Sequence, residues 1–257
     1  EILSHLELLV EDLKSRPLNR EPIPHEPHQF GSRRVRKEFA VPYSKLHLAW
    51  RLPCSAHPDT PALSALSSIL GGGRSARFYE KFHDRLGLVY SIEVHSNQSE
   101  TDEGAFTISM DVDRAQRDKV RDLVLQELRN LAEEDFTEDL KRVCKQTRVS
   151  RLRRRSSASG VASEMGADWF GSRNLNLSSE WQEAIERVTT EDLHRVCSTW
   201  LSSPNVTEVS LDPPGSNAGD EERASASAGT ALSEHVLGNG MKVVIREDHR
   251  LPLAYAC

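Results

Sequence analysis

LGGGRSARFYEKFHDRLGLVY, residues 70–90, is the most informative stretch of this sequence. An apolar helix pattern stops at three consecutive glycines, and a second amphipathic segment follows and ends near Gly87. This pattern does not fit a nucleotide-binding P-loop. In a P-loop the spaced glycines lie between a strand and a helix and are followed by Lys-Ser or Lys-Thr, whereas here the glycines follow a helix pattern and neither dipeptide comes after them. A corner between two helices fits every residue. Gly71 is predicted to take the left-handed cap, and Gly72 and Gly73 to reverse the chain.

The segments around this corner predict a fold that mixes strands and helices. Asp59 or Thr60 is expected to cap the helix before the glycines, and Gly87 to end the helix after them, with Leu86 on its buried face. Alternating apolar residues predict strands at 45–53, 90–94, 105–112 and 206–212. Amphipathic patterns predict helices at 116–134, at 137–155 with Thr137 as cap, near 158–170 and at 180–201. Strands in adjacent pairs and helices in blocks indicate an α+β fold, with an antiparallel-rich sheet and helices packed on one face.

Two predicted linkers divide the chain, one after an N-terminal helix and one before a C-terminal hairpin. Residues 1–16 predict an amphipathic helix, and the polar, proline-rich stretch after it predicts a linker. Residues 212–231 are rich in Pro, Gly, Ser, Ala and acids, which is typical of a solvated interdomain linker. Beyond them, Asn239-Gly240 between two apolar runs predicts a β-hairpin that opens a second domain. Since there is no initiator Met and the last residues are apolar, we expect a fragment of a longer chain.

Composition narrows the function classes. The chain has 257 residues, 28% of them charged, and a formal net charge of −6, which does not favour general binding to nucleic acid or to membrane surfaces. No apolar run is long enough for a membrane span. The four cysteines form no CxxC pair, so neither a zinc ribbon nor a redox motif is indicated. The arginine cluster at 148–155 is interpreted as a solvated helix end, and nucleic-acid binding remains a third hypothesis.

Several collinear motifs resemble one known family. Residues 62–94, ALSALSSILGGGRSARFYEKFHDRLGLVYSIEV, resemble the signature of the second domain in half-units of the pitrilysin/insulinase zinc peptidases, family M16. HPDTPAL, LRNLAEEDFTEDLKRVCKQ, IERVTTEDLHRV and LGNGMKVVIREDHRLPLA resemble further family segments in the same order. The resemblance covers nearly the whole chain. Its structural signature residues are Gly71, Gly72, Gly73, Arg74, Ser75, Arg77 and Gly87.

This resemblance implies an architecture and an organisation into domains. The fold would be the LuxS/MPP-like metallohydrolase fold, with two half-units closing around a chamber that takes in peptides. Residues 1–20 would be the tail of a preceding catalytic-type domain, 21–32 a linker, and 33–212 the non-catalytic C-terminal-type domain. Residues 213–231 would be an interdomain linker, and 232–257 the first strands of a second half-unit.

Catalysis in the family uses zinc held by an inverted His-x-x-Glu-His motif and a distant Glu, and its motif Glu serves as base. This sequence lacks that motif: HEPH at 25–28 has the wrong order and lies in the linker. The resemblance therefore implies zinc in the intact parent, none bound by these residues, and no peptide hydrolysis by this segment alone. The implied partners are a peptide or unfolded polypeptide and the other half-unit on the same chain, with no nucleic acid and no membrane span.

Substrate anchoring is the role left for this segment. In some members an Arg and the Tyr of the LRxxxGLxY segment reach the peptide across the chamber, giving oxyanion-type stabilisation. The Tyr is Tyr90 here, but His83 stands in the Arg position and lacks the charge and fork of Arg. A core or strand role for Tyr90 and a surface-helix role for His83 remain open.

The leading hypothesis is thus a chamber wall of a zinc metalloendopeptidase that helps to bind peptide. The alternative is a catalytically inactive M16 homologue that acts as a scaffold or core-type subunit, which the His83 departure favours. The expected location is the bacterial cytoplasm or periplasm.

Overall fold

The computed structural model describes residues 2–13, 29–98, 103–202, 205–214, 232–236 and 242–246, the last two stretches as backbone only. Its contacts divide the chain into two units, Glu1–Pro214 and Gly215–Cys257. The HEPH sequence, most of both predicted linkers, the Asn239-Gly240 turn and Cys257 lie outside the described residues.

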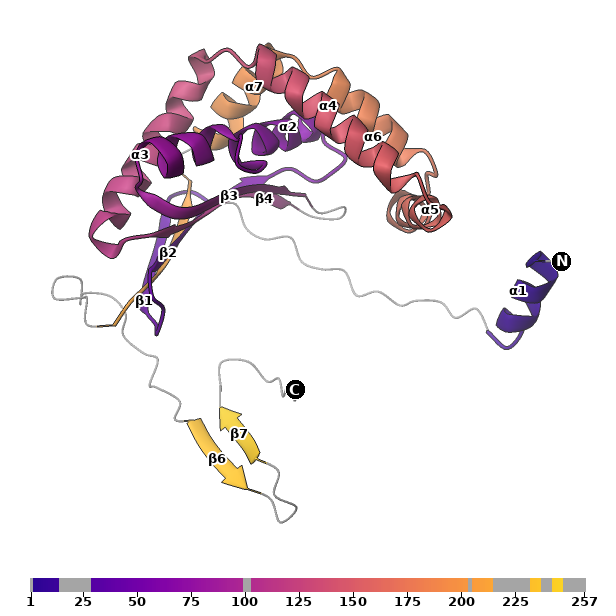
Figure 1. The fold of residues 1–257 in the computed structure, drawn as a ribbon, viewed down its shortest axis with the longest axis horizontal. Helices are drawn as coiled ribbons and strands as arrows, with labels where there is room; N and C mark the ends of the chain where they lie inside the picture. Colours follow the sequence, from indigo (N-terminus) through magenta and orange to yellow (C-terminus); the bar gives the residue numbers. More distant parts are fainter. Residues whose placement is uncertain are drawn as a thin grey trace. The chain divides into compact units, whose positions relative to one another are not determined.

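A mixed sheet organises the described part of the larger unit (Figure 1). Its strands run in the order β1-β5-β2-β4-β3. They are β1 (Arg33–Glu38), β2 (Ser44–Leu52), β3 (Val89–Asn97), β4 (Gly104–Val112) and β5 (Thr207–Asp212). Only the β1–β5 pair is parallel among them; the pairs β5–β2, β2–β4 and β4–β3 are antiparallel. The α+β fold class and the antiparallel-rich sheet are confirmed.

Helices cover one face of this sheet, as predicted (Figure 1). They are α2 (Thr60–Gly71), the π-helical turn η1 (Tyr79–Arg85), α3 (Arg117–Asn130), α4 (Thr137–Arg154), α5 (Ala158–Ser172), α6 (Leu177–Glu186), α7 (Thr190–Val196) and the π-helical turn η4 (Cys197–Leu201). Short 3-10 turns, η2 (Arg114–Gln116) and η3 (Leu131–Glu133), flank α3. Among the described residues, no helix is long and apolar enough to cross a membrane.

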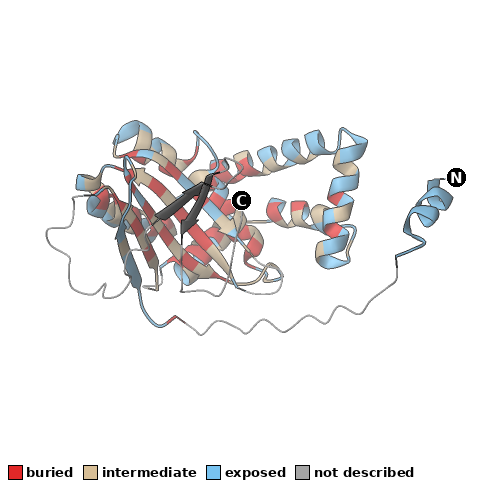
Figure 2. Cartoon of the chain, turned by 90° about the horizontal axis from the view of Figure 1, so that it is seen from below, coloured by how far each residue is buried: buried red, intermediate tan, exposed pale blue. Residues whose placement is uncertain are grey.

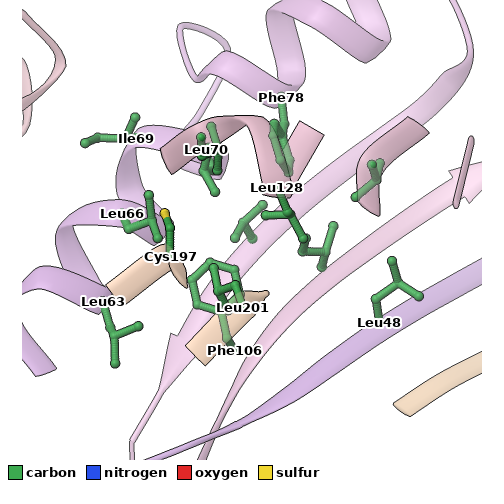
Figure 3. Close-up of a cluster of buried hydrophobic side chains, with 14 of the residues drawn as sticks. Leu48, Leu63, Leu66, Ile69, Leu70, Phe78, Phe106, Leu128, Cys197 and Leu201 are labelled. Atoms are coloured by element: carbon green, nitrogen blue, oxygen red, sulfur yellow. The ribbon is translucent and has the colours of Figure 1, made fainter. Parts of the chain in front are cut away.

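The core lies between the sheet and this helical layer. On β2 the burial alternates, so that Leu46, Leu48, Trp50 and Leu52 all face the helices. Leu66 of α2, Phe106 of β4 and Leu201 of η4 meet in the same buried cluster (Figure 3). Burial of this apolar area is the main force that holds the two layers together. Cys197 belongs to this core, and burial raises the pKa of its thiol to about 12, so it is a packing residue and not a nucleophile.

The glycine corner forms, but the left-handed conformation predicted at Gly71 occurs at Gly73 instead. Gly71 is the last residue of α2 and Gly72 its C-cap, whereas Gly73 takes the positive φ of 101° that was expected at Gly71. Gly71 is instead required by a close approach: a Cβ there would lie 2.5 Å from the backbone nitrogen of Val94. Gly87 has φ 59° and follows η1, as predicted.

Two further local expectations were wrong. Leu86 is 48% exposed, because the π-helical turn before it rotates the chain out of the α-helical phase on which the prediction relied. Thr137 does not cap α4 with its side chain. Its backbone N–H and its hydroxyl both donate to Asp135 Oδ1, at 3.0 and 2.7 Å. The Asp135 carboxylate therefore supplies the acceptor for the first backbone N–H of this helix.

Asp59 occupies the N-cap position of α2, but its carboxylate binds elsewhere. It is buried, pairs with Arg195 and accepts from Trp200 Nε1 at 2.9 Å, so it ties α2 to α7 and η4. Burial on its own would raise the pKa of Asp59, but the hydrogen bonds from Trp200 and Arg195 outweigh it and hold the pKa below its ordinary value.

We therefore expect Asp59→Asn to lower the free energy of unfolding at pH 7 by about 1–3 kcal/mol, the value of hydrogen bonds to a charged group. Because the folded-state pKa is depressed, this contribution is complete above the unfolded pKa of about 3.9 and is lost as the pH falls through the folded value. Urea denaturation of both proteins at pH 7 and pH 3 measures it. A difference that stays constant with pH would contradict the assignment.

Helix α1 (Ile2–Val10) lies within the predicted N-terminal helix, and all its residues are exposed. In the second unit, β6 (Leu232–Val236) pairs antiparallel with β7 (Lys242–Arg246), so the predicted hairpin strands form. Strand β1 was not predicted, because its sequence RRVRKE carries a single apolar residue.

Candidate functional site

Tyr90 lies on β3 at an irregularity in the strand. Val89 pairs with Val112 and Ser91 with Asp111, so Tyr90 is an extra residue without a partner in the β3–β4 register. Such a bulge re-aims a side chain that regular alternation would point elsewhere. The Tyr90 side chain is accordingly not in the core, and the residue is 53% exposed.

A second tyrosine accompanies Tyr90 and was not predicted from the sequence. The Tyr43 ring lies against the Tyr90 ring, with centroids 4.1 Å apart and planes at 34°. Tyr43 immediately precedes β2 and is 42% exposed. The only sequence signal for it is an aromatic residue next to the start of a strand. Two adjacent exposed phenols offer both apolar surface and hydroxyl groups, which suits contact with a peptide.

His83 belongs to a different local cluster from Tyr90. It lies in η1, where its ring stacks on Tyr79 with centroids 4.4 Å apart, and its Nδ1 lies 2.7 Å from Asp84 Oδ1. Within residues 29–98, no hydrogen bond or ring contact joins His83 to Tyr90. The structure therefore does not bring the two predicted anchoring residues into direct contact.

Among the remaining signature residues, Arg77 makes contacts that stabilise the fold. Arg77 donates to Asp139 Oδ2 at 2.7 Å and to Glu134 Oε2 at 3.2 Å, and its guanidinium lies 4.6 Å from the Phe136 ring centroid. It therefore fastens the glycine corner to the start of α4. Arg74 and Ser75 are exposed in the turn between α2 and η1.

The sheet face opposite the helices carries polar groups beside small apolar ones. His47 on β2 contacts Ser109 Oγ at 2.8 Å through Nδ1, and Lys45 pairs with Asp111 at 2.9 Å. Burial lowers the pKa of His47, so the imidazole is neutral at pH 7. In the described part of the chain, no group of three or more His, Cys, Asp or Glu residues is arranged to hold a metal ion.

The arginine cluster of α4 is mostly engaged in ion pairs. Arg148 pairs with Glu186 of α6, and Arg151 and Arg155 both pair with Glu164 of α5. The hydrogen bond from Arg151 is the largest cause that lowers the pKa of Glu164, and Arg155 adds to it. These pairs connect α4 to the two following helices, whereas the sequence was interpreted as a solvated helix end.

Comparison with known proteins gives one consistent result. Residues 1–146 match the family model described as the peptidase M16 inactive domain. The chain is 24% identical over 211 residues to the zinc protease PqqE of Helicobacter pylori, covering 79% of this chain and 46% of that protein.

Solved structures show the same fold. A protease from Helicobacter pylori superposes with a TM-score of 0.74 at 24% identity, covering 82% of this chain and 52% of that one. The M16 inactive domain from Pseudomonas fluorescens gives 0.65 at 20%, covering 74% and 45%. The periplasmic protease PqqL from Escherichia coli gives 0.65 at 14%, covering 82% and 24%. The chain thus spans about half the length of PqqE and of the first of these structures.

Proposed function

The chain belongs to the peptidase M16 family, and from this premise we propose that it forms a non-catalytic chamber wall of a zinc-dependent endopeptidase and helps to bind the peptide substrate. The match to the family's inactive-domain model carries the proposal. Zinc belongs to the proposed intact enzyme, and the described residues of this chain offer no cluster that fits it.

The proposed organisation follows the family. Residues 33–212 form the non-catalytic domain, 1–20 the tail of a preceding catalytic-type domain, and 232–257 the start of a second half-unit after the 213–231 linker. The proposed partners are an extended peptide and the other half-unit. We place the enzyme in the bacterial cytoplasm or periplasm, and the description of the similar PqqL as periplasmic supports the latter.

Tyr90 is the proposed peptide-binding residue of this wall. Its position at the bulge and its exposure leave the phenol free to meet a ligand, and the Tyr43 ring supports it from one side. A hydrogen bond from a phenol to a substrate carbonyl is strengthened as negative charge develops on that oxygen. His83 contributes less, because its Nδ1 already contacts Asp84.

Tyr90→Phe in the protein expressed from its complete gene is expected to lower kcat/KM for peptide cleavage about tenfold, the equivalent of one hydrogen bond. Tyr43→Phe is the matched control, since it keeps the ring contact and removes a hydroxyl from the neighbouring ring. We expect it to stay within twofold of the wild type. Equal effects of both substitutions, or none at Tyr90, would remove Tyr90 from the binding surface.

The second candidate is a catalytically inactive, scaffold-type homologue, which the replacement of the family Arg by His83 favours. The same preparation distinguishes the two functions. Peptide cleavage that a metal chelator abolishes and added zinc restores supports the endopeptidase. No cleavage by the properly folded protein, under conditions where a related zinc protease is active, would support the scaffold.

A further inference from the structure

The orientation of the Tyr90 side chain depends on few contacts. In the described part of the chain, this side chain makes no hydrogen bond, and its one aromatic contact is the Tyr43 ring. An exposed side chain exchanges between rotamers within nanoseconds unless a neighbour holds it. Because Tyr90 is 53% exposed and stands at a bulge, its backbone alone does not fix where the hydroxyl lies.

The Tyr43 ring, in contrast, stands on a backbone that is held on both sides. Before it, the N–H of Val41 closes a tight turn with a hydrogen bond of 2.8 Å, and the ring of Pro42 limits rotation about φ. After it, Ser44 is fully buried, and its Oγ donates to Asp212 Oδ1 at 2.6 Å. The backbone of Tyr43 is therefore tied to the core next to its exposed ring.

The two rings meet across the end of one strand. Ser44 on β2 and Val89 on β3 lie on the two sides of Val112, the last residue of β4. Neighbouring strands lie about 4.8 Å apart, so the backbones of β2 and β3 are separated by roughly 10 Å. The tyrosine rings bridge this separation, with centroids 4.1 Å apart and planes at 34°. Such ring pairs favour one arrangement of the two side chains over others.

We propose that Tyr43 is the positioning residue for Tyr90: its ring holds the Tyr90 phenol in the orientation that donates to a substrate carbonyl. This inference rests on the proposed peptide-binding role of Tyr90. Tyr43 acts through its ring and not through its hydroxyl, and it affects the substrate only through Tyr90. A group that is correctly oriented for part of the time loses apparent affinity in proportion to that fraction, so loss of the Tyr43 ring weakens the action of Tyr90.

Peptide cleavage by the protein expressed from its complete gene tests this role in a double-mutant cycle. Tyr43→Leu removes the ring and is expected to lower kcat/KM about fivefold, the population ratio that an aromatic pair of this kind supports. Tyr43→Phe keeps the ring and is expected to keep the activity. In a Tyr90→Phe background, Tyr43→Leu is expected to change kcat/KM by less than twofold, because no hydroxyl remains to be positioned.

Phe170→Leu is the matched control for the loss of an exposed ring. Phe170 is 81% exposed on α5, in the part of the helical layer that projects beyond the sheet (Figure 2). We expect this variant to stay within twofold of the wild type.

Fluorine NMR of the 257-residue chain labelled with 3-fluorotyrosine gives a readout that does not depend on activity. The Tyr90→Phe spectrum assigns the Tyr90 signal. Tyr43→Leu is expected to move this signal toward the position of a free tyrosine, and Tyr43→Phe to leave it in place. The signal of Tyr79, whose ring stacks on His83, is expected to stay unchanged in both variants.

The outcomes separate this inference from the proposed function. If Tyr90→Phe lowers kcat/KM but Tyr43→Leu changes neither the activity nor the Tyr90 signal, the positioning role is wrong and the binding role of Tyr90 stands. Equal losses from Tyr43→Leu in both backgrounds would show that Tyr43 acts independently of Tyr90, which also overturns the inference. Absence of cleavage, or a Tyr90→Phe protein with wild-type activity, would overturn both.

Discussion

Arg117→Met is expected to lower the free energy of unfolding by about 3–5 kcal/mol, the cost of removing one partner of a buried ion pair. Arg117 begins α3 and contacts Asp212 at the end of β5, whose side chain is fully buried. Ser44 Oγ donates to the same carboxylate at 2.6 Å. Without the guanidinium, the buried carboxylate keeps only the hydroxyls of Ser44 and, at 3.5 Å, Ser210 as partners among the described residues, and it loses its opposite charge. Urea denaturation followed by tryptophan fluorescence measures the loss.

Two further proteins identify the cause. Arg187→Met removes an exposed ion pair with Glu183 and is expected to cost less than about 0.5 kcal/mol, because such surface pairs contribute little. The double variant Arg117→Met/Asp212→Asn removes the buried charge as well as its partner, and we expect it to recover at least half of the loss. A single variant as stable as Arg187→Met would show that the Arg117–Asp212 pair does not stabilise the fold.

Gly71→Ala is the second substitution with a large expected effect. The added Cβ would meet the Cβ and the backbone nitrogen of Val94, each at 2.5 Å, so the end of α2 and strand β3 must move apart. We expect a loss of about 1–3 kcal/mol, as for other overpacked sites. Thermal and urea unfolding of the purified chain give the difference.

Gly166→Ala is the matched control for this substitution. Gly166 lies within α5, and a Cβ there meets nothing within 4 Å. Since Ala is a better helix former than Gly, this variant is expected to gain up to about 1 kcal/mol. If Gly71→Ala were as stable as the wild type, the close approach of α2 to β3 would not be the reason for a glycine at this position.

The two substitutions test two different contacts between helices and the sheet. Gly71 sets the distance between the glycine corner and β3, the strand that carries Tyr90 at its bulge. Arg117 joins α3 to the end of β5 and, through Asp212, to Ser44 at the start of β2. Ser44 directly follows Tyr43, so both contacts support the strands that hold the proposed tyrosine pair.

Local patterns predicted much of this molecule because their causes are local. The alternation in β2 and β4 and the apolar stripe of α2 each specify one buried face, and the structure buries that face. Glycine signals likewise gave the corner at 71–73 and the stop at Gly87. The collinear motifs identified the M16 family, which the family model confirms.

Contacts between distant segments could not be predicted in this way. In β5 the buried positions are Glu208, Ser210 and Asp212, whereas Val209 and Leu211 face the other side of the sheet. Hydrophobic alternation would favour the opposite orientation. The polar face is buried because Arg34 and Arg117, far away in sequence, neutralise its carboxylates. Such pairing depends on which segments become neighbours in the fold. The sequence of a single strand does not show which distant segments these will be.

The candidate sites show the same division. Sequence identified Tyr90, but its exposure results from a bulge opposite β4, and Tyr43 becomes its neighbour only when β2 and β3 are both in the sheet. The cavity lined by α4, α5 and α6 corresponds to no motif in the sequence, because its residues Arg154, Glu164 and Gln182 come from three different helices. Periodicity and turn chemistry act over a few residues and fix the elements. Exposure, bulges and cavities arise where the elements meet, so they depend on the packed chain.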